Sequence, residues 1–231
     1  MTIRIVTDSS CDLPESIIDD LNIIVIPLYI HIGEKSYLDN VDINREEFYK
    51  NLPVYTPYPT TASPSPETIL KTYERLAREG ASQILSIHLS RVLSGTYQAA
   101  QLAVKEFKSI PVTVIDSRQL SLGFGFLVRT AAQLAQQGRA LEEIITSLED
   151  QIKRTYVFAA LDTLEYLHRS GRMTFAIAGI GSLLSIKPLM KMHDGKPGSV
   201  LCRTWKNAVD QLIRLVKDLG PLEEISFVHS N

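Results

Sequence analysis

The sequence predicts an α/β fold in two domains: an N-terminal α/β/α domain with a parallel sheet and a C-terminal mixed α/β domain. Its 231 residues suffice for two modest domains that each bury a core. The first half alternates Ile- and Val-rich runs with amphipathic segments, as parallel strands joined by helices do. This alternation stops near residue 155, so we place the domains at residues 1–155 and 156–231.

Each element of the N-terminal domain has its own signal. Short, nearly continuous apolar runs are typical of strands buried on both faces. Helices follow a capping residue, with Asp12 and Ser65 in this role and a proline near the first turn, and Gly138 suits a helix end. The expected strands are residues 3–7, 23–29, 84–89 and 112–115, and the expected helices are residues 14–21, 66–78, 96–107, 120–136 and 141–154.

Two segments interrupt this alternation. Residues 34–53 read as extended chain followed by a short helix that Asn44 caps. Five prolines fall within residues 53–66, which predicts an ordered crossing loop without a regular element, because proline lacks a backbone donor.

The C-terminal domain has a different pattern. We expect a strand at 156–161, a helix at 162–168, a small apolar run at 175–184, a hairpin of 186–192 with 199–204, a helix at 206–219 and a strand at 225–229.

Composition excludes several classes of function. The net charge of −2 gives no electrostatic footprint for nucleic acid. Cys11 and Cys202 lie far apart, and the five histidines show no ligand spacing, so we expect no metal site and mostly surface or packing roles for the histidines. The N-terminus lacks a signal-peptide pattern, and the longest apolar stretches, at 21–32 and 175–186, are too short for a membrane span. We therefore expect a cytoplasmic protein.

Hydroxyl-bearing residues collect where the predicted parallel strands end. These are Thr7-Asp8-Ser9-Ser10, then Ser90 with Ser94-Gly95-Thr96, and Asp116-Ser117. Ligands of open parallel sheets bind at this edge, where the N–H groups of following helices favour an anion. The plainer interpretation is that each group only caps a helix. Asp8 is open to three roles: metal ligand, nucleophile or cap.

Catalytic motifs are weak. Ser94 lies outside a Gly-x-Ser-x-Gly turn, and the chain has neither a Walker A sequence nor a Rossmann glycine fingerprint. Gly123 and Gly125 lie within a helical pattern, which indicates close packing. The enzymatic alternative is a small-molecule hydrolase or phosphotransferase that uses Asp8 or Ser94.

Seven short motifs, in order along nearly the whole chain, resemble those of the DegV family of bacterial fatty-acid-binding proteins. They are TDSSCDLP at 7–14, PTTASPSP at 59–66, LSGTYQAA at 93–100, VIDS at 114–117, SGR at 170–172, IKPLM at 186–190 and CRTWKNA at 202–208.

The resemblance implies a carrier without catalytic groups or a cofactor. Two α/β domains would enclose a long acyl chain in a pocket between them, and a separate fatty acid kinase would convert the presented lipid to an acyl phosphate. Membrane contact would be at most transient, for lipid exchange. A protein that senses lipid and regulates a partner is a further alternative. Residues 120–134 and 175–189 are candidate tunnel walls, although plain core packing explains them equally well.

The resemblance also assigns site residues. Thr61 and Ser94 would bind the fatty-acid carboxylate, Arg172 would support them, and Arg203 would face the kinase. Ser63, Gly95 and Thr96 complete the expected carboxylate site. The chain departs from the family at Thr61-Ala62-Ser63-Pro64-Ser65, where the family reads Thr-Ser-Gln-Pro-Ser. It also stops before the His-Thr-Gly-Pro-Gly segment of the family, so we expect the C-terminal domain to lack its last segment.

Overall fold

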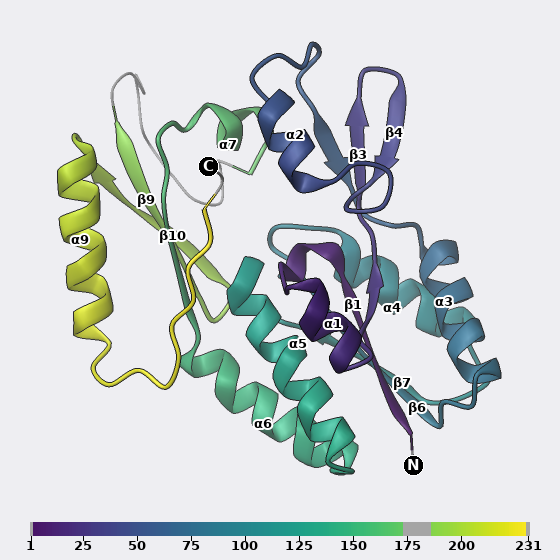
Figure 1. Cartoon of the computed structure of the whole chain (residues 1–231). Helices are drawn as coiled ribbons and strands as arrows, with labels where there is room; N and C mark the ends of the chain where they lie inside the picture. The colour runs from purple at the N-terminus through teal and green to yellow at the C-terminus, as the bar shows by residue number, and fades with distance from the viewer. Residues whose placement is uncertain (1, 173–185, 230–231) are drawn as a thin grey trace.

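A four-stranded parallel sheet organises the first half of the protein (Figure 1). The computed structural model describes residues 2–172 and 186–229. The strand order is β2-β1-β6-β7, and every neighbouring pair is parallel. The strands are β1 (Ile3–Asp8), β2 (Ile24–Ile26), β6 (Gln83–His88) and β7 (Val112–Asp116). The predicted parallel sheet is confirmed.

Helices cover both faces of this sheet, as predicted. On one face α3 (Pro66–Arg78) and α4 (Thr96–Glu106) pack on Val6 and Ile84. On the other, α5 (Ser121–Gln136) and α6 (Leu141–Arg154) pack on Ile5 and Leu85, together with the short α1 (Glu15–Asp20). Alternate strand residues therefore supply the two cores, and each fully buried aliphatic side chain contributes about 1.5–3 kcal/mol.

The apolar run at 23–29 forms two strands in different sheets, so its prediction as one strand is wrong. Pro27 has no N–H to donate to a ladder, and the chain leaves the parallel sheet after Ile26. It then enters an antiparallel sheet of order β4-β3-β5, made of β3 (Tyr29–Ile32), β4 (Lys35–Leu38) and β5 (Thr60–Ala62).

Strand β5 also corrects the expectation of a proline-rich loop without regular structure. Its three residues lie between Pro59 and Pro64 and carry no proline, so their N–H groups are free to pair with β3. The helix α2 (Arg45–Asn51) begins as predicted, because Asn44 accepts a 2.8 Å hydrogen bond from the N–H of Glu47.

The C-terminal part contains a second antiparallel sheet, of order β10-β9-β8. It comprises β8 (Tyr156–Ala160), β9 (Lys187–His193) and β10 (Lys196–Cys202), followed by α9 (Trp205–Asp218). The predicted hairpin is confirmed, and Asp194 and Gly195 both have positive φ, as its tight turn requires. A separate sheet thus begins at residue 156, whereas the domain boundary at 155 stays a prediction.

Two contacts attach one end of this C-terminal sheet to the parallel-sheet layer. The N–H of Gly195, at the hairpin tip, donates to the Arg118 carbonyl, and the Arg118 guanidinium pairs with Asp194 at 3.0 Å.

Two glycines of α5 lie in close contact with neighbouring segments. A Cβ added to Gly123 would overlap Val157 of β8, and one added to Gly125 would overlap the Cys11 carbonyl oxygen. Both glycines permit close packing, as predicted.

The second half differs from the prediction in two other elements. The helix expected at 162–168 is the shorter α7 (Glu165–Arg169). The strand expected at 225–229 is wrong, because no described strand pairs with this segment and it lies exposed. Its upstream residues Glu223 and Glu224 instead pair with Arg154 and Arg129.

Of the two candidate tunnel walls, the structure describes residues 120–134 and only the last residues of 175–189. Most of residues 175–189 lie outside the described residues. In α5, Phe124, Leu127 and Val128 are fully buried in the core against the sheet and α6, which favours core packing. In the described ranges, none of the helices combines the length and the apolar character needed to span a bilayer.

Candidate functional site

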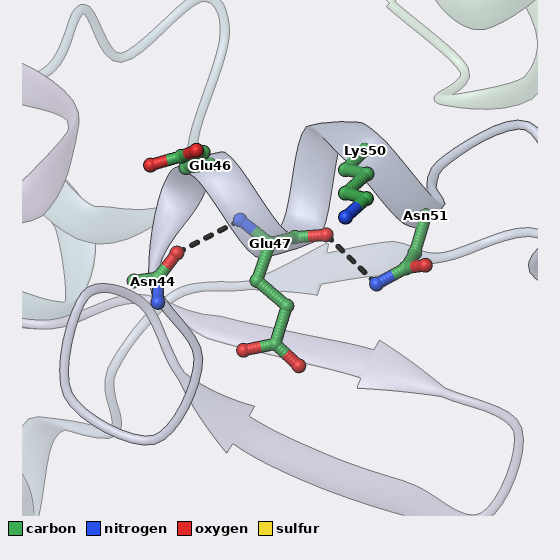
Figure 2. Close-up of a pocket in the computed structure, with 5 residues that line it drawn as sticks. All are labelled: Asn44, Glu46, Glu47, Lys50 and Asn51. Atoms are coloured by element: carbon green, nitrogen blue, oxygen red, sulfur yellow. Dashed lines mark hydrogen bonds between the residues drawn. The ribbon is translucent and has the colours of Figure 1, made fainter.

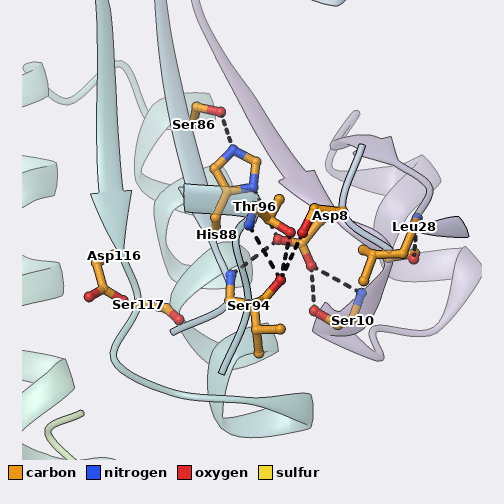
Figure 3. Close-up of polar contacts among 12 residues, drawn as sticks. Asp8, Ser10, Leu28, Ser86, His88, Ser94, Thr96, Asp116 and Ser117 are labelled. Atoms are coloured by element: carbon orange, nitrogen blue, oxygen red, sulfur yellow. Dashed lines mark hydrogen bonds and ion pairs between the residues drawn. The ribbon is translucent and has the colours of Figure 1, made fainter. Parts of the chain in front are cut away.

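The three predicted groups of hydroxyl-bearing residues lie at the same edge of the parallel sheet, as Figure 3 shows. Asp8 at the end of β1 bonds to His88 at the end of β6, and His88 is in register with Asp116 at the end of β7. The three groups nevertheless differ in what their side chains contact.

A line of hydrogen bonds, here called the buried polar chain, joins Tyr73, Ser86, His88 and Asp8. The Tyr73 hydroxyl donates to Ser86 Oγ at 2.8 Å, and Ser86 Oγ lies 2.8 Å from His88 Nε2. His88 Nδ1 in turn lies 3.0 Å from one oxygen of the Asp8 carboxylate. All four side chains are fully buried, and burial raises the pKa of Tyr73 to about 12.

The Asp8 carboxylate is fully occupied inside the protein. One oxygen accepts from His88 and from the Leu89 N–H at 3.1 Å, and the other accepts from both the N–H and the hydroxyl of Ser10. Asp8 thereby caps the 3-10 helix η1 (Ser9–Cys11). Of the three roles considered for Asp8, the geometry supports capping. Although Asp8, His88 and Ser86 are connected like a catalytic triad, no substrate can reach buried side chains whose hydrogen bonds are all made internally.

The Asp116-Ser117 group makes hydrogen bonds to its own loop and to the loop after β6. One Asp116 oxygen accepts from the backbone N–H groups of Arg91 and Arg118, at 3.3 and 2.9 Å. The buried Ser117 hydroxyl donates to the Gln119 carbonyl at 3.2 Å. These contacts shape the turn between β7 and α5.

The group after β6 contributes Ser94 and Thr96 to a cluster with Ser63 of the proline-rich segment, here called the hydroxyl cluster. Ser94 Oγ lies 3.2 Å from Ser63 Oγ and 2.9 Å from Thr96 Oγ1, and it accepts from the Thr96 N–H at 3.3 Å. Ser63 and Ser94 are only partly buried. The cluster sits at the N-terminus of α4, whose cap Gly95 offers no side chain, so the helix end favours a negative charge.

This cluster has donors for an anion but no base for a nucleophile. The hydrogen bonds of Ser94 Oγ in the described ranges go to two hydroxyls and a backbone N–H. A serine without a neighbouring base is a weak nucleophile. The described residues also contain no group of His, Cys, Asp or Glu that could hold a metal ion.

Arg172 and Thr61 approach the hydroxyl cluster from two further segments. Arg172 Nε donates to the Leu93 carbonyl at 3.3 Å, which places a cation beside Ser94. Thr61 is exposed on β5, two residues before Ser63, and none of the hydrogen bonds within residues 2–172 and 186–229 joins it to the cluster. The structure therefore brings together Ser63, Ser94, Gly95 and Thr96, with Arg172 linked through Leu93.

The sequence did not predict the contacts of three side-chain groups near the site. His88 belongs to the buried polar chain, although its sequence suggested surface or packing roles. Arg45 pairs with Asp12 and Asp39 and donates to the Ser9 carbonyl, which fastens α2 to the loop after β1. Burial opposes its charge, but hydrogen bonds and ion pairs with the two carboxylates outweigh it and raise the Arg45 pKa. The third group is an aromatic stack of Tyr58 on Tyr166. Arg45 could have been singled out from the sequence, because a cation is unusual in the first turn of a helix, where anions are preferred.

A surface hollow of about 270 Å³ lies on α2, lined by Asn44, Glu46, Glu47, Lys50 and Asn51 (Figure 2). Asn44 and Asn51 in it bond to the backbone of Glu47, at 2.8 and 3.0 Å. None of the predicted site residues lines it, and its polar walls do not suit an acyl chain.

The fold and the hydroxyl cluster define an α/β protein that gathers hydroxyl side chains at the strand ends of a parallel sheet. The comparisons with known proteins give the family. The family model described as "uncharacterised protein, DegV family" matches residues 2–231, and the chain belongs to the DegV family.

Relatives and solved structures agree with this assignment. A DegV domain-containing protein of Caldanaerobacter subterraneus subsp. tengcongensis is 37% identical, with 99% of this chain and 82% of that protein covered. A fatty-acid-binding DegV family protein from Thermus thermophilus is similar with a TM-score of 0.82 and 35% identity, over 95% of this chain and 78% of that one. DegV from Bacillus subtilis, described as a fatty acid binding protein, has a TM-score of 0.85 and 32% identity, over 94% and 78%.

Proposed function

We propose that this protein binds a long-chain fatty acid in a pocket between its two α/β parts and holds the carboxylate at the hydroxyl cluster. Ser94 and Ser63 are the central donors, Thr96 and Gly95 present the N-terminus of α4, and Thr61 and Arg172 complete the site. Structural relatives that bind fatty acids support this ligand class, including a stearic-acid-binding protein from Eubacterium ventriosum.

The single observation that carries the proposal is the hydroxyl cluster itself. Ser94 Oγ lies 3.2 Å from Ser63 Oγ and 2.9 Å from Thr96 Oγ1, which gathers hydroxyls from two distant segments at the N-terminus of α4. The guanidinium of Arg172 donates to the Leu93 carbonyl and adds a positive charge next to this residue. A carboxylate needs such donors, and hydroxyls with a helix end provide them without a buried lysine.

The tail supplies most of the affinity in this proposal. Each buried CH2 group contributes about 0.8 kcal/mol, so a tail of roughly 16 carbons provides a large driving force before the costs of association. The hydroxyl cluster then fixes the orientation of the head group.

The test is native mass spectrometry of the purified protein with palmitic acid, combined with thermal unfolding. We expect one bound palmitate and a higher Tm, since a ligand at about 100 times its Kd adds about 2.7 kcal/mol. Hexadecan-1-ol, with the same tail and no carboxylate, is the matched ligand control and should bind more weakly. A protein that takes up neither ligand under gentle conditions contradicts the proposal.

A turnover assay separates this carrier from the hydrolase or phosphotransferase alternative. We expect no hydrolysis of p-nitrophenyl esters or p-nitrophenyl phosphate. Activity that is lost in Ser94→Ala, or in Asp8→Asn under conditions where circular dichroism shows this variant to be folded, would instead establish the enzyme.

We further propose that a separate fatty acid kinase receives the bound lipid, with Arg203 on the contact surface. Arg203 is exposed after β10, between Leu201 and Trp205, whose side chains are 45% and 50% exposed. Arginine beside exposed aromatic and aliphatic residues is typical of interface centres.

Charge reversal tests this contact. With a bacterial fatty acid kinase and ATP, Arg203→Glu should bind palmitate normally but yield little acyl phosphate. Lys196→Glu, at the far end of the same hairpin, is the control and should support normal phosphorylation. Unchanged phosphorylation with Arg203→Glu contradicts the assignment.

A further inference from the structure

Three separate chain segments carry the residues of the proposed carboxylate site. Thr61 and Ser63 lie within the proline-rich segment 53–66, Ser94 and its neighbours follow β6, and Arg172 follows α7. For these side chains to act on one carboxylate, each segment has to be held beside the other two. The inference below rests on the proposed function.

Two of the three links between these segments are direct hydrogen bonds of the site. Ser63 Oγ lies 3.2 Å from Ser94 Oγ, which joins the first segment to the second. Arg172 Nε donates to the Leu93 carbonyl at 3.3 Å, which joins the third segment to the second.

The third link is an aromatic and cationic contact, here called the clasp, formed by Tyr58, Tyr166 and Arg169. The rings of Tyr58 and Tyr166 are stacked, with centroids 5.6 Å apart and planes inclined by 22°. The Arg169 guanidinium lies over the Tyr58 ring, 5.0 Å from its centroid. Both geometries are attractive ones for these groups.

The clasp is placed close to the residues that it would position. Tyr58 lies three residues before Thr61, and Arg169 lies three residues before Arg172. Tyr166 and Arg169 both belong to α7, where Arg169 also pairs with Glu165. In Figure 1, α7 lies beside the region of α2 and the following loop that leads to β5.

We infer that the clasp holds the two outer segments together and thereby controls how long a bound fatty acid is retained. Tyr58, Tyr166 and Arg169 are positioning residues, since they act through Thr61, Ser63 and Arg172. The clasp is only partly buried, with Tyr166 41% exposed, so it can open without unfolding of the core.

The main experiment measures the release of palmitic acid from the loaded protein to albumin. Tyr58→Ala and Tyr166→Ala should each raise the release rate roughly three- to tenfold, since each removes the stack. The double variant should release no faster than about the faster single variant, because both changes remove one contact. Tyr58→Phe keeps the ring and should behave like the wild type.

The chain offers a matched control in a second exposed stack. Tyr156 and His193 stack with centroids 4.0 Å apart at the other end of the C-terminal sheet, and Tyr156 is 38% exposed. Tyr156→Ala removes a comparable contact that links no site segments, so its release rate should match the wild type. Wild-type release rates in both Tyr58→Ala and Tyr166→Ala would overturn the inference.

A second readout does not depend on lipid. Trypsin cuts after Arg169 and Arg172, and cleavage follows the population of the opened state when opening is fast. Ligand-free Tyr58→Ala should be cut there several-fold faster than the wild type or Tyr156→Ala, and equal rates would overturn the clasp. If the wild type binds no palmitic acid, the proposed function fails, and the tryptic rates alone decide on the clasp.

Discussion

The buried polar chain and the hydroxyl cluster lie at the same edge of the parallel sheet but differ in how fully their hydrogen-bonding groups are used. In the buried polar chain, Asp8 accepts four hydrogen bonds and every member is fully buried. In the hydroxyl cluster, Ser63 and Ser94 are partly exposed and bond mainly to other hydroxyls, which can turn toward a ligand. The first arrangement supports structure, whereas the second is the one to which we assign the proposed binding role.

The comparison shows why a concentration of polar residues does not by itself mark a site. Asp8, His88 and Ser86 have the residue types of a catalytic triad, yet burial and complete internal pairing exclude them from substrate. Ser94 has no base, but its position at an open helix end suits an anion. The two groups therefore differ in accessibility and in whether their hydrogen-bond partners are other hydroxyls, which can rotate.

The largest expected effect is on the buried polar chain. Asp8→Ala leaves the buried imidazole of His88 and the part-buried N–H groups of Leu89 and Ser10 without their acceptor. We expect the free energy of unfolding to fall by about 3–5 kcal/mol. Urea unfolding measures this change, and a loss below about 1 kcal/mol would show that Asp8 is not the anchor described here.

A smaller effect at neutral pH, with a distinct pH dependence, is expected for Tyr73→Phe. The lost hydroxyl should cost about 1 kcal/mol at pH 7. The Tyr73 pKa is raised from 10.0 to about 12 by burial, so between these values the folded protein keeps a proton that the unfolded chain loses. This contribution is constant below pH 10 and falls by about 2–3 kcal/mol as the pH rises to 12.

Stability measured across this alkaline range in both proteins tests the Tyr73 assignment. The wild type should lose stability more steeply between pH 10 and 12 than Tyr73→Phe. Parallel curves for the two proteins would mean that Tyr73 ionises normally in the fold.

The smallest effect on stability is expected in the hydroxyl cluster. Ser94→Ala removes a partly exposed hydroxyl and should change the free energy of unfolding by less than about 0.5 kcal/mol. Palmitate affinity should fall roughly threefold to tenfold, as expected for one lost hydrogen bond to a charged group that water partly replaces.

Titration with palmitic acid, monitored by tryptophan fluorescence or calorimetry, measures this change. Ser109→Ala is the control, because Ser109 is exposed before β7, at the opposite edge of the sheet. A strong loss of stability without a loss of affinity in Ser94→Ala would reverse the comparison between the two groups.

Much of the fold follows from local patterns in the sequence. The runs around Ile5, Ile87 and Ile115 predict buried parallel strands, and the Asn44 cap predicts the start of α2, because these signals are local. The division of residues 23–29 between two sheets and the pairing of β5 depend on partners far along the chain, which local periodicity does not encode.

The candidate site was likewise predictable only where its residues are close in sequence. Ser94, Gly95 and Thr96 are adjacent in sequence, so their common position at the start of α4 was predictable. The bond from Ser63 to Ser94 and the contact of Arg172 with Leu93 join distant segments, and only the family resemblance indicated them. The buried polar chain was missed because Ser86 and His88 face the core on alternate positions of a strand that reads as apolar.

The attachment of the hairpin tip to Arg118 has a mechanical consequence. Tyr156 of β8 is in register with His193 at the tip, whereas Ala160, toward α7, is in register with Leu189. The C-terminal sheet is therefore fastened to the parallel-sheet layer at its Arg118 end, where Gly123 also receives Val157. If the clasp and the contact of Arg172 with Leu93 open, tilting of this sheet would use the Arg118 end as a pivot, with the greatest displacement at α7.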